Sequence, residues 1–275
     1  MTSAVITSRS PSGDAIVATT PRFRSLRIYL AEAKYELRKQ TRIPAFMIPT
    51  IGFPIMFYVL FGLLMQHGNK DSATVATYML ATYGAFGVIS IALFSLGVGV
   101  AAERGQGWLA VKKASPMPLT AYFTAKYLTT LAIGAILMLL MCVIGAVFGH
   151  VRMSAAQWTM LIVSETLGAI PFCAMGLAIG YLAGPNSAAP VVNILYLPMA
   201  FLSGLFIPAE MLPRFLQGFA VVLPPYHLAR LALETVGIEP ASHALVHIAA
   251  LVGFGALFTV IASIGYHRDE GKTYG

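Results

Sequence analysis

The sequence has little charge and little cysteine. Only 11% of its 275 residues are charged, whereas 57% are hydrophobic. A soluble domain carries about 25% charged residues and could not bury this much apolar surface, so the composition indicates an integral membrane protein. The two cysteines, Cys142 and Cys173, lie in apolar segments without disulfide or metal-site spacing, which predicts buried free thiols.

The sequence also lacks the short motifs of several common activities. There is no GxxxxGK(S/T) phosphate-binding loop, so this chain does not hold a nucleotide in the usual way. There is no HExxH, CxxC or GxSxG pattern, and we expect no catalytic, cofactor-binding or metal-binding residues. His243 and His247 stand at i, i+4 spacing, which we interpret as an interfacial face rather than a metal site. The net charge of +7 is divided among short patches, which argues against a nucleic-acid partner.

Six apolar segments match the length of a membrane-spanning helix, which needs about 20 residues. They are residues 44–65, 73–101, 121–149, 156–183, 187–207 and 243–266. Pro190 and Pro198 interrupt the fifth, which we interpret as a kinked helix. We therefore predict an all-α integral membrane protein with six transmembrane helices, built as one domain over residues 22–275 after a disordered tail at 1–21.

Two other segments flank these spans. Residues 22–42 have apolar residues at helical spacing beside a basic stripe, which predicts an amphipathic helix in the membrane interface; a solvated helix is the alternative. Residues 208–242 are apolar but broken by Pro208, Pro213, Pro224 and Pro225. This pattern predicts short external helices that re-enter the outer leaflet before the last span.

The distribution of Lys and Arg predicts the orientation. With the N-terminus inside, the inner flanks hold fourteen of these residues and the outer flanks hold four. Because cytoplasmic flanks are enriched in Lys and Arg, both termini and the segment 102–120 are expected to be cytoplasmic. Glycines at four-residue spacing (Gly145 and Gly149; Gly176, Gly180 and Gly184) predict closely packed helices.

Glu165 is the one ionisable residue well inside a predicted span. A charge at membrane depth is costly, so such a residue usually faces a cavity or a partner. It is either a polar point on a substrate path or a protonated carboxyl bonded to Ser164, Thr166 or a backbone carbonyl. The first reading leads to an alternative function, a gradient-driven secondary transporter that uses Glu165.

Two stretches carry a resemblance to a known family. They are "ERGQGWLAVKKASPMP" at residues 103–118 and "NILYLPMAFLSGLFIPAEMLPRFLQGFAVVLPPYHLARLAL" at residues 193–233. With the order of the spans, they resemble the permease subunit of a type-2 ABC exporter, the class that exports drugs, lipids or polysaccharides in bacteria. Matching positions are Glu103, Arg104, Gly105, Pro116, Asn193, Ser203, Gly204, Pro208 and Pro213. Leu223, Pro224 and Pro225 depart from the Asn-Pro that the family often has.

The resemblance implies a second permease copy, in a homodimer or heterodimer, and a separate ATPase that binds ATP and Mg²⁺. It places the chain in the bacterial inner membrane, in contact with lipids. It also implies that a cytoplasmic helix at about 102–114 couples to the ATPase, through Glu103, Arg104, Gly105, Trp108, Leu109, Val111 and Pro116. A plain topogenic loop is the alternative for that segment.

The resemblance further suggests a substrate path between two copies, lined by spans two and five. The candidate residues are Phe86, Phe94, Asn193, Tyr196 and Phe201, with Glu165 as a further polar point. Aromatic walls suit an amphipathic or lipid-like molecule. An intramembrane enzyme and a structural or regulatory membrane subunit remain as other classes.

Overall fold

Five helices in the described part of the chain are long and apolar enough to cross a membrane. The computed structural model describes residues 22–66, 71–115, 117–240 and 242–270, with no strand among them. The candidate spans are Phe46–Leu64, Ser72–Gly105, Leu119–Phe148, Ala155–Leu182 and Ala244–Asp269. A shorter apolar helix, Ala188–Leu202, takes the place of the expected fifth span. The predicted all-α membrane fold is confirmed, and the tail at 1–21 lies outside the described residues.

Several spans consist of consecutive helical pieces. The first joins α2 (Pro44–Phe57) to a π-helical stretch, η1 (Tyr58–Leu64). The second runs through α3 (Ser72–Ala92), η2 (Leu93–Val98) and α4 (Gly99–Gly105). The third is α6 (Leu119–Phe148), the fourth is α7 (Ala155–Gly168) with α8 (Ile170–Leu182), and the last is α12 (Ala244–Glu270). Pro44 begins α2, where its missing N–H costs no helical hydrogen bond.

The helix at the fifth position is shorter than the sequence predicted. α9 (Ala188–Leu202) has 15 residues, or about 22 Å at 1.5 Å per residue, against a hydrocarbon core of about 30 Å. It ends because Gly204 adopts a φ of +84°, a left-handed conformation that stops the helix. The expected span 187–207 is therefore corrected to a helix that ends at Leu202.

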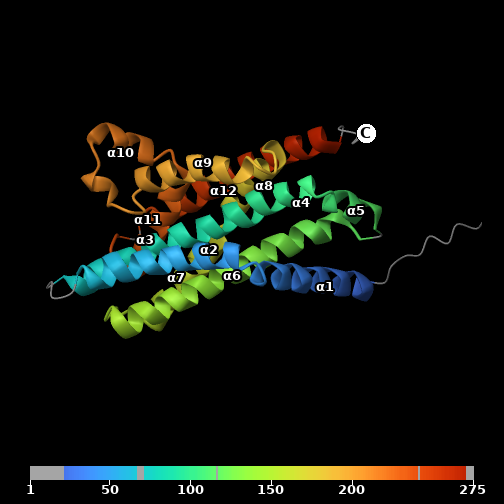
Figure 1. Cartoon of the computed structure of the whole chain (residues 1–275). Helices are drawn as coiled ribbons and strands as arrows, with labels where there is room; N and C mark the ends of the chain where they lie inside the picture. The colour runs from blue at the N-terminus through green and yellow to red at the C-terminus, as the bar shows by residue number, and fades with distance from the viewer. Residues whose placement is uncertain (1–21, 67–70, 116, 241, 271–275) are drawn as a thin grey trace, which may run out of the picture.

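Short helices gather at one end of the bundle. They are η3 (Ala209–Met211), α10 (Arg214–Ala220) and α11 (Pro224–Val236), and each follows or begins with a proline of the 208–242 segment. Figure 1 shows α10 at the end opposite to α1 (Arg22–Thr41), α5 (Trp108–Ala114) and the C-terminal end of α12. The N-terminal helix and the segment after span two thus lie on the same side of the bundle.

Two glycines allow α8 to pack closely on η2. A Cβ at Gly176 would lie 2.9 Å from the carbonyl oxygen of Ala92, and one at Gly180 would lie 2.8 Å from that of Leu96. Side chains larger than hydrogen do not fit there, so these glycines act as the predicted close-packing row. Gly184 meets only Ser187 and does not extend that row to a third contact.

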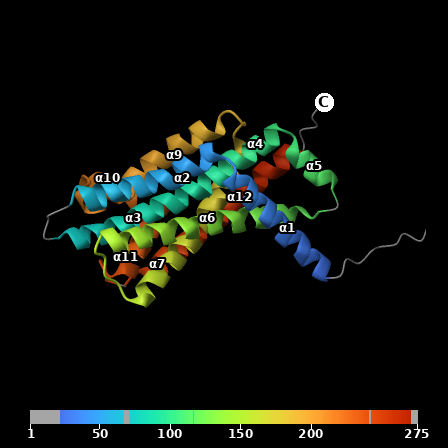
Figure 2. The ribbon, with the colours of Figure 1, turned by 60° about the horizontal axis from the view of Figure 1, so that its bottom comes forward.

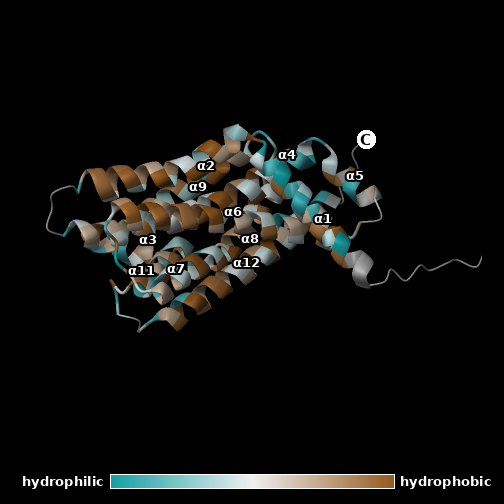
Figure 3. Ribbon diagram, turned by 90° about the horizontal axis from the view of Figure 1, so that it is seen from below, coloured by the Kyte–Doolittle hydropathy of each residue, from teal (hydrophilic) through white to brown (hydrophobic). Residues whose placement is uncertain are grey.

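Hydropathy follows the architecture. Hydrophobic residues cover the long helices, whereas hydrophilic residues gather on α1 and α4 and at the ends of the bundle (Figure 3). In Figure 2, α9, α2 and α3 are seen running along one another on one side of the bundle. The pocket described next lies among these three helices.

Candidate functional site

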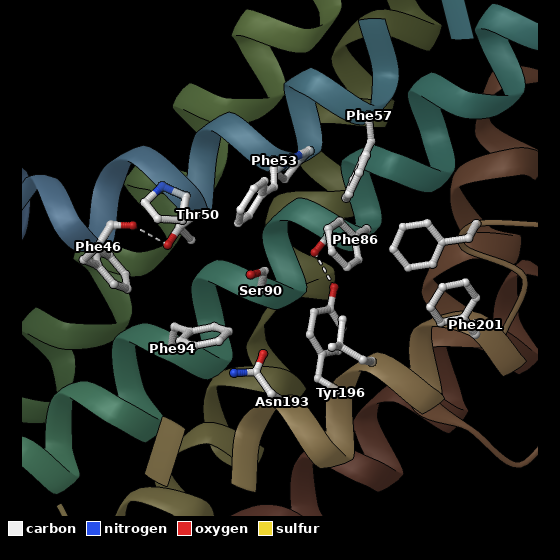
Figure 4. Close-up of a pocket in the computed structure, with 14 residues that line it drawn as sticks. Phe46, Thr50, Phe53, Phe57, Phe86, Ser90, Phe94, Asn193, Tyr196 and Phe201 are labelled. Carbon is white, nitrogen blue, oxygen red and sulfur yellow. Dashed lines mark hydrogen bonds between the residues drawn. The ribbon is translucent and has the colours of Figure 1, made fainter. Parts of the chain in front are cut away.

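A pocket of about 440 Å³ lies among α2, α3, η2 and α9. Its walls are mostly aromatic rings and prolines, with a few polar side chains (Figure 4). The lining residues are Phe46, Pro49, Thr50, Phe53, Pro54, Phe57, Phe86, Ser90, Phe94, Asn193, Tyr196, Leu197, Phe201 and Phe206. An apolar cavity with a few polar groups is typical of a binding site for a small organic molecule.

Stacked rings close one end of this pocket. Phe206, in the turn after α9, has its ring centroid 4.6 Å from that of Phe201 and 4.8 Å from that of Phe86. Phe86 also stacks on Tyr196 at 5.3 Å, and the Tyr196 hydroxyl donates a hydrogen bond to the Phe86 carbonyl oxygen. These contacts join α3 to α9 and hold the aromatic wall in place.

The polar groups of the pocket are few and mostly engaged with backbone. Thr50 donates to the carbonyl oxygen of Phe46, and the Asn193 amide donates to that of Ala189 at 3.1 Å. Asn193 is exposed, and Ser90 also lines the pocket. Asn193 and Ser90 are therefore the polar groups that a ligand in the pocket would meet.

The structure brings together most of the residues predicted for the substrate path. Phe86, Phe94, Asn193, Tyr196 and Phe201 all line this one pocket. Sequence reasoning missed the contribution of span one and of the turn that carries Phe206. The spacing of Phe46, Phe53 and Phe57 by seven and four residues places these rings on one helix face, and this signal was available in the sequence.

Glu165 is not part of the pocket. Its side chain on α7 is fully buried among α3 and α6, and neither carboxyl oxygen has a hydrogen-bond partner among the described residues. A Cβ at Gly84 would lie 2.6 Å from Glu165 Oε2. Ser164 instead donates to the Leu161 carbonyl. The expected hydrogen bond from Glu165 to Ser164, Thr166 or a backbone carbonyl is therefore wrong among the described residues. Glu165 does not line this pocket, and its role on a substrate path stays a prediction.

A largely buried cluster of charges joins three helices at the end of the bundle that carries α5. Lys126 Nζ on α6 lies 2.7 Å from Glu36 Oε1 on α1 and 2.9 Å from Glu103 Oε1 on α4. Tyr122 donates to Glu103 Oε2 at 2.6 Å, and Lys39 pairs with both carboxylates. We call these five residues the Glu103 cluster. Its two lysines balance its two glutamates, as buried charges require.

The cluster sets the charge state of Glu36. Burial raises the pKa of this carboxyl, but the positive charges of Lys126 and Lys39 outweigh burial and hold the pKa below its usual value. Glu36 therefore stays ionised and ties α1 to α6. The buried side of α1 is polar at this point, which the amphipathic pattern of 22–42 did not predict.

Arg104 is also engaged within the chain. Its guanidinium forms a fork with the Asp269 carboxylate, with Nε 3.0 Å from Oδ2, and donates to the carbonyl oxygens of Gly180 and Ala183. Within the chain, Glu103 thus pairs with α1 and α6, and Arg104 with α8 and α12. The coupling of this pair to an ATPase stays a prediction. Gly105 permits close contact with the turn between α8 and α9, since a Cβ there would lie 2.3 Å from Pro185 Cγ.

The helix expected at 102–114 is divided into two. α4 ends at Gly105, and Gly107, with a φ of +74°, separates it from α5. On α5, Leu109 is buried, whereas Trp108 and Val111 are 54% and 62% exposed. Pro116 lies outside the described residues. The exposed apolar surface of this segment is therefore on α5, one turn beyond the charged pair.

Comparison with known proteins agrees with this architecture. The fold defines a multi-pass helical membrane protein with a mostly aromatic pocket among its helices. Residues 29–237 match the family described as ABC-2 type transporter, and the chain belongs to that family. It is 27% identical over 235 residues to the "Putative transport permease YvfS" of Bacillus subtilis (strain 168), with 86% of this chain and 95% of that relative covered. The chain is thus the membrane subunit of an ABC transporter, a class that works with a partner ATPase.

Proposed function

We propose that the chain is the permease of an ATP-driven exporter that moves an amphipathic or lipid-like substrate, such as a drug, lipid or glycan. The observation that carries this proposal is the aromatic pocket among α2, α3 and α9. Its rings suit an apolar body, and Ser90 and Asn193 suit a small polar part. The transporter would lie in the bacterial inner membrane with both termini in the cytoplasm, as the Lys and Arg distribution favours.

The partner ATPase would dock on α5. Trp108 and Val111 are exposed there, and aromatic residues often anchor protein interfaces. ATP and Mg²⁺ would be held by that partner, since this sequence has no phosphate-binding loop. Movement of α5 would reach the bundle through α4, because Glu103 and Arg104 fix the end of α4 to its neighbours.

A second permease copy would cover the open side of the pocket. Of the residues that line the pocket, Phe53 on α2 and Phe201 on α9 are about half exposed; outside the lining, Ile194 on α9 is 71% exposed. Burial of this apolar face against an identical copy gives a homodimer with the substrate path between the copies. A heterodimer with a similar permease is the alternative, and mass measurement of the purified complex separates the two.

The test is to purify the permease with its ATPase in lipid nanodiscs and measure ATP hydrolysis. Phospholipids, glycolipids and cationic amphipathic drugs form the panel. We expect at least one class to stimulate hydrolysis in a saturable way. Stable purification without any ATPase, with uptake or efflux driven by an ion gradient alone, would reject the proposal.

Glu165→Gln separates this function from the gradient-driven alternative. The buried carboxyl lies outside the pocket, so an ATP-driven exporter should keep its substrate-stimulated ATP hydrolysis in this variant. A gradient-driven carrier would lose coupled transport, because its proton-binding group would be gone.

A further inference from the structure

Two buried histidines meet at the end of the bundle that carries the short helices. His227 on α11 and His247 on α12 are 7% and 8% exposed, and their Nδ1 atoms lie 3.0 Å apart. His247 thus pairs with His227 rather than with His243, the partner at i, i+4 spacing. Neither ring lines the pocket. The pair joins a short helix to the last span.

This contact holds only one proton. At 3.0 Å one Nδ1 must donate and the other must accept, so at least one of the two rings is neutral there. If both rings became imidazolium, two N–H groups and two positive charges would face each other. Burial lowers the pKa of His227 below its usual value, although a backbone hydrogen bond with Val221 opposes that shift.

The surroundings contain few other charges. Glu234 on α11 has Oε1 3.9 Å from His247 Nε2 and accepts a hydrogen bond from the His243 backbone in the turn before α12. Arg230 on α11 and the His243 ring also act on His247, and the Tyr226 ring lies edge-on to both imidazoles. Among the interactions described for either ring, none comes from a titratable group of α3, α7 or α8. Glu234 can balance one proton on the pair, but a second proton has no counter-charge.

α11 is also linked to the turn that carries Phe206. Arg230, one turn after His227, forms ion pairs with Glu210 of η3 and with Glu239. Tyr78 donates to the carbonyl oxygen of Gly204 at 3.3 Å. These contacts fix both sides of the turn that carries Phe206, the ring that closes one end of the pocket. Displacement of α11 would remove one of the two supports of Phe206.

We propose that the His227–His247 pair is a proton sensor. At neutral pH the pair holds α11 against α12; when a second proton binds, α11 is released and Phe206 loses one of its supports at the end of the pocket. The sensor would respond to protons outside the cytoplasm if the orientation proposed above holds. The local effect on α11 requires neither ATP nor substrate, so it can be tested separately from the transport function.

Hydrogen–deuterium exchange of α11 tests this sensor. The full chain in nanodiscs is compared at pH 7.5 and 5.5, with each rate corrected for the intrinsic pH dependence of exchange. Uptake of one extra proton on opening makes the open form about tenfold more populated per pH unit below the usual histidine pKa. We therefore expect the amides of α11 to lose protection against exchange at pH 5.5 in the wild type. They should keep this protection in His247→Gln and in His227→Gln, because the glutamine that replaces one histidine of the pair takes up no proton.

His267→Gln is the matched control, because this histidine lies at the opposite end of α12. It should lose protection at acidic pH as the wild type does. Equal acid loss in the control and in both pair variants would overturn the proposal, as would unchanged wild-type protection. Zinc chloride added at pH 7.5 gives a further outcome: zinc-dependent protection in the wild type, without any acid effect, would assign the pair to a metal instead.

Discussion

The Lys126 ammonium lies 2.9 Å from the Glu103 carboxylate, which joins α6 to α4 through an ion pair inside the bundle. Lys126 is 1% exposed and also contacts Glu36 on α1. Three segments at the end of the bundle that carries α5 are thus connected by one ammonium group. A displacement of α4 cannot leave α1 and α6 in place without separating buried charges.

Lys126→Met should destabilise the protein strongly. It leaves two buried glutamates with only Lys39, and removal of one partner from a buried ion pair costs about 3–5 kcal/mol. Lys112→Met is the control, because Lys112 pairs with Glu32 in a more exposed setting and should cost about 1 kcal/mol. Denaturant unfolding in detergent measures both. Equal losses in the free energy of unfolding would show that Lys126 stabilises the protein no more than the more exposed Lys112 does.

Acid should weaken the attachment of α1 through Glu36. Since the pKa of Glu36 is lowered in the folded state, its contribution is complete above the unfolded value of about 4.3 and is lost as the pH falls through the folded value. The thermal midpoint of the wild type should therefore fall more steeply below about pH 4.3 than that of Glu36→Gln. Parallel curves for the two proteins would contradict this assignment.

Gly180→Ala should disturb the packing of α8 on η2. The new methyl group would lie 2.8 Å from the Leu96 carbonyl oxygen and 3.1 Å from that of Gly97, and backbone atoms cannot move aside cheaply. We expect a loss of about 1–3 kcal/mol in the free energy of unfolding. Gly253→Ala on α12 meets nothing within 4 Å, so it should be neutral or slightly stabilising. A neutral Gly180→Ala would show that the two segments are not in close contact.

Trp108→Ala should weaken assembly with the ATPase while the permease stays folded. The indole is 54% exposed, so its removal costs little within the chain, whereas loss of an aromatic anchor costs an interface more than about 1 kcal/mol. We expect affinity for the ATPase to fall by about tenfold. Phe215→Ala on α10 removes a ring that is 68% exposed at the opposite end and should leave assembly unchanged. Similar affinity in the two variants would place the ATPase elsewhere.

The sequence predicted the helical spans well because apolar length and composition are local properties. The prolines of residues 208–242 also predicted short helices, but the shortness of α9 depends on the backbone conformation of Gly204, which composition does not reveal. The sequence predicted one part of the pocket lining: the aromatic residues of spans two and five were identified, whereas those of span one were not. Which helix covers an aromatic face is decided by tertiary packing rather than by local pattern.

The charged residues were the hardest to interpret. Glu103 and Arg104 follow an apolar run, and such a position is usual for a surface pair. Their partners are distant in sequence: Lys126 is 23 residues from Glu103, and Asp269 is 165 residues from Arg104. No periodic signal links such positions. Similarly, His247 was considered with its helical neighbour His243, whereas its partner His227 lies 20 residues away on another helix.

The aromatic pocket is proposed to bind the exported substrate. The most direct measurement is the concentration of a stimulating lipid or drug that gives half-maximal ATP hydrolysis by the purified complex, compared between wild type, Phe201→Ala and Phe215→Ala. Phe201 lines the pocket and Phe215 does not. We predict that Phe201→Ala raises this concentration by about tenfold, for a loss of roughly 1.4 kcal/mol of binding, and that Phe215→Ala leaves it unchanged. An unchanged value in Phe201→Ala, or an equal shift in both variants, would show that the substrate does not bind in this pocket.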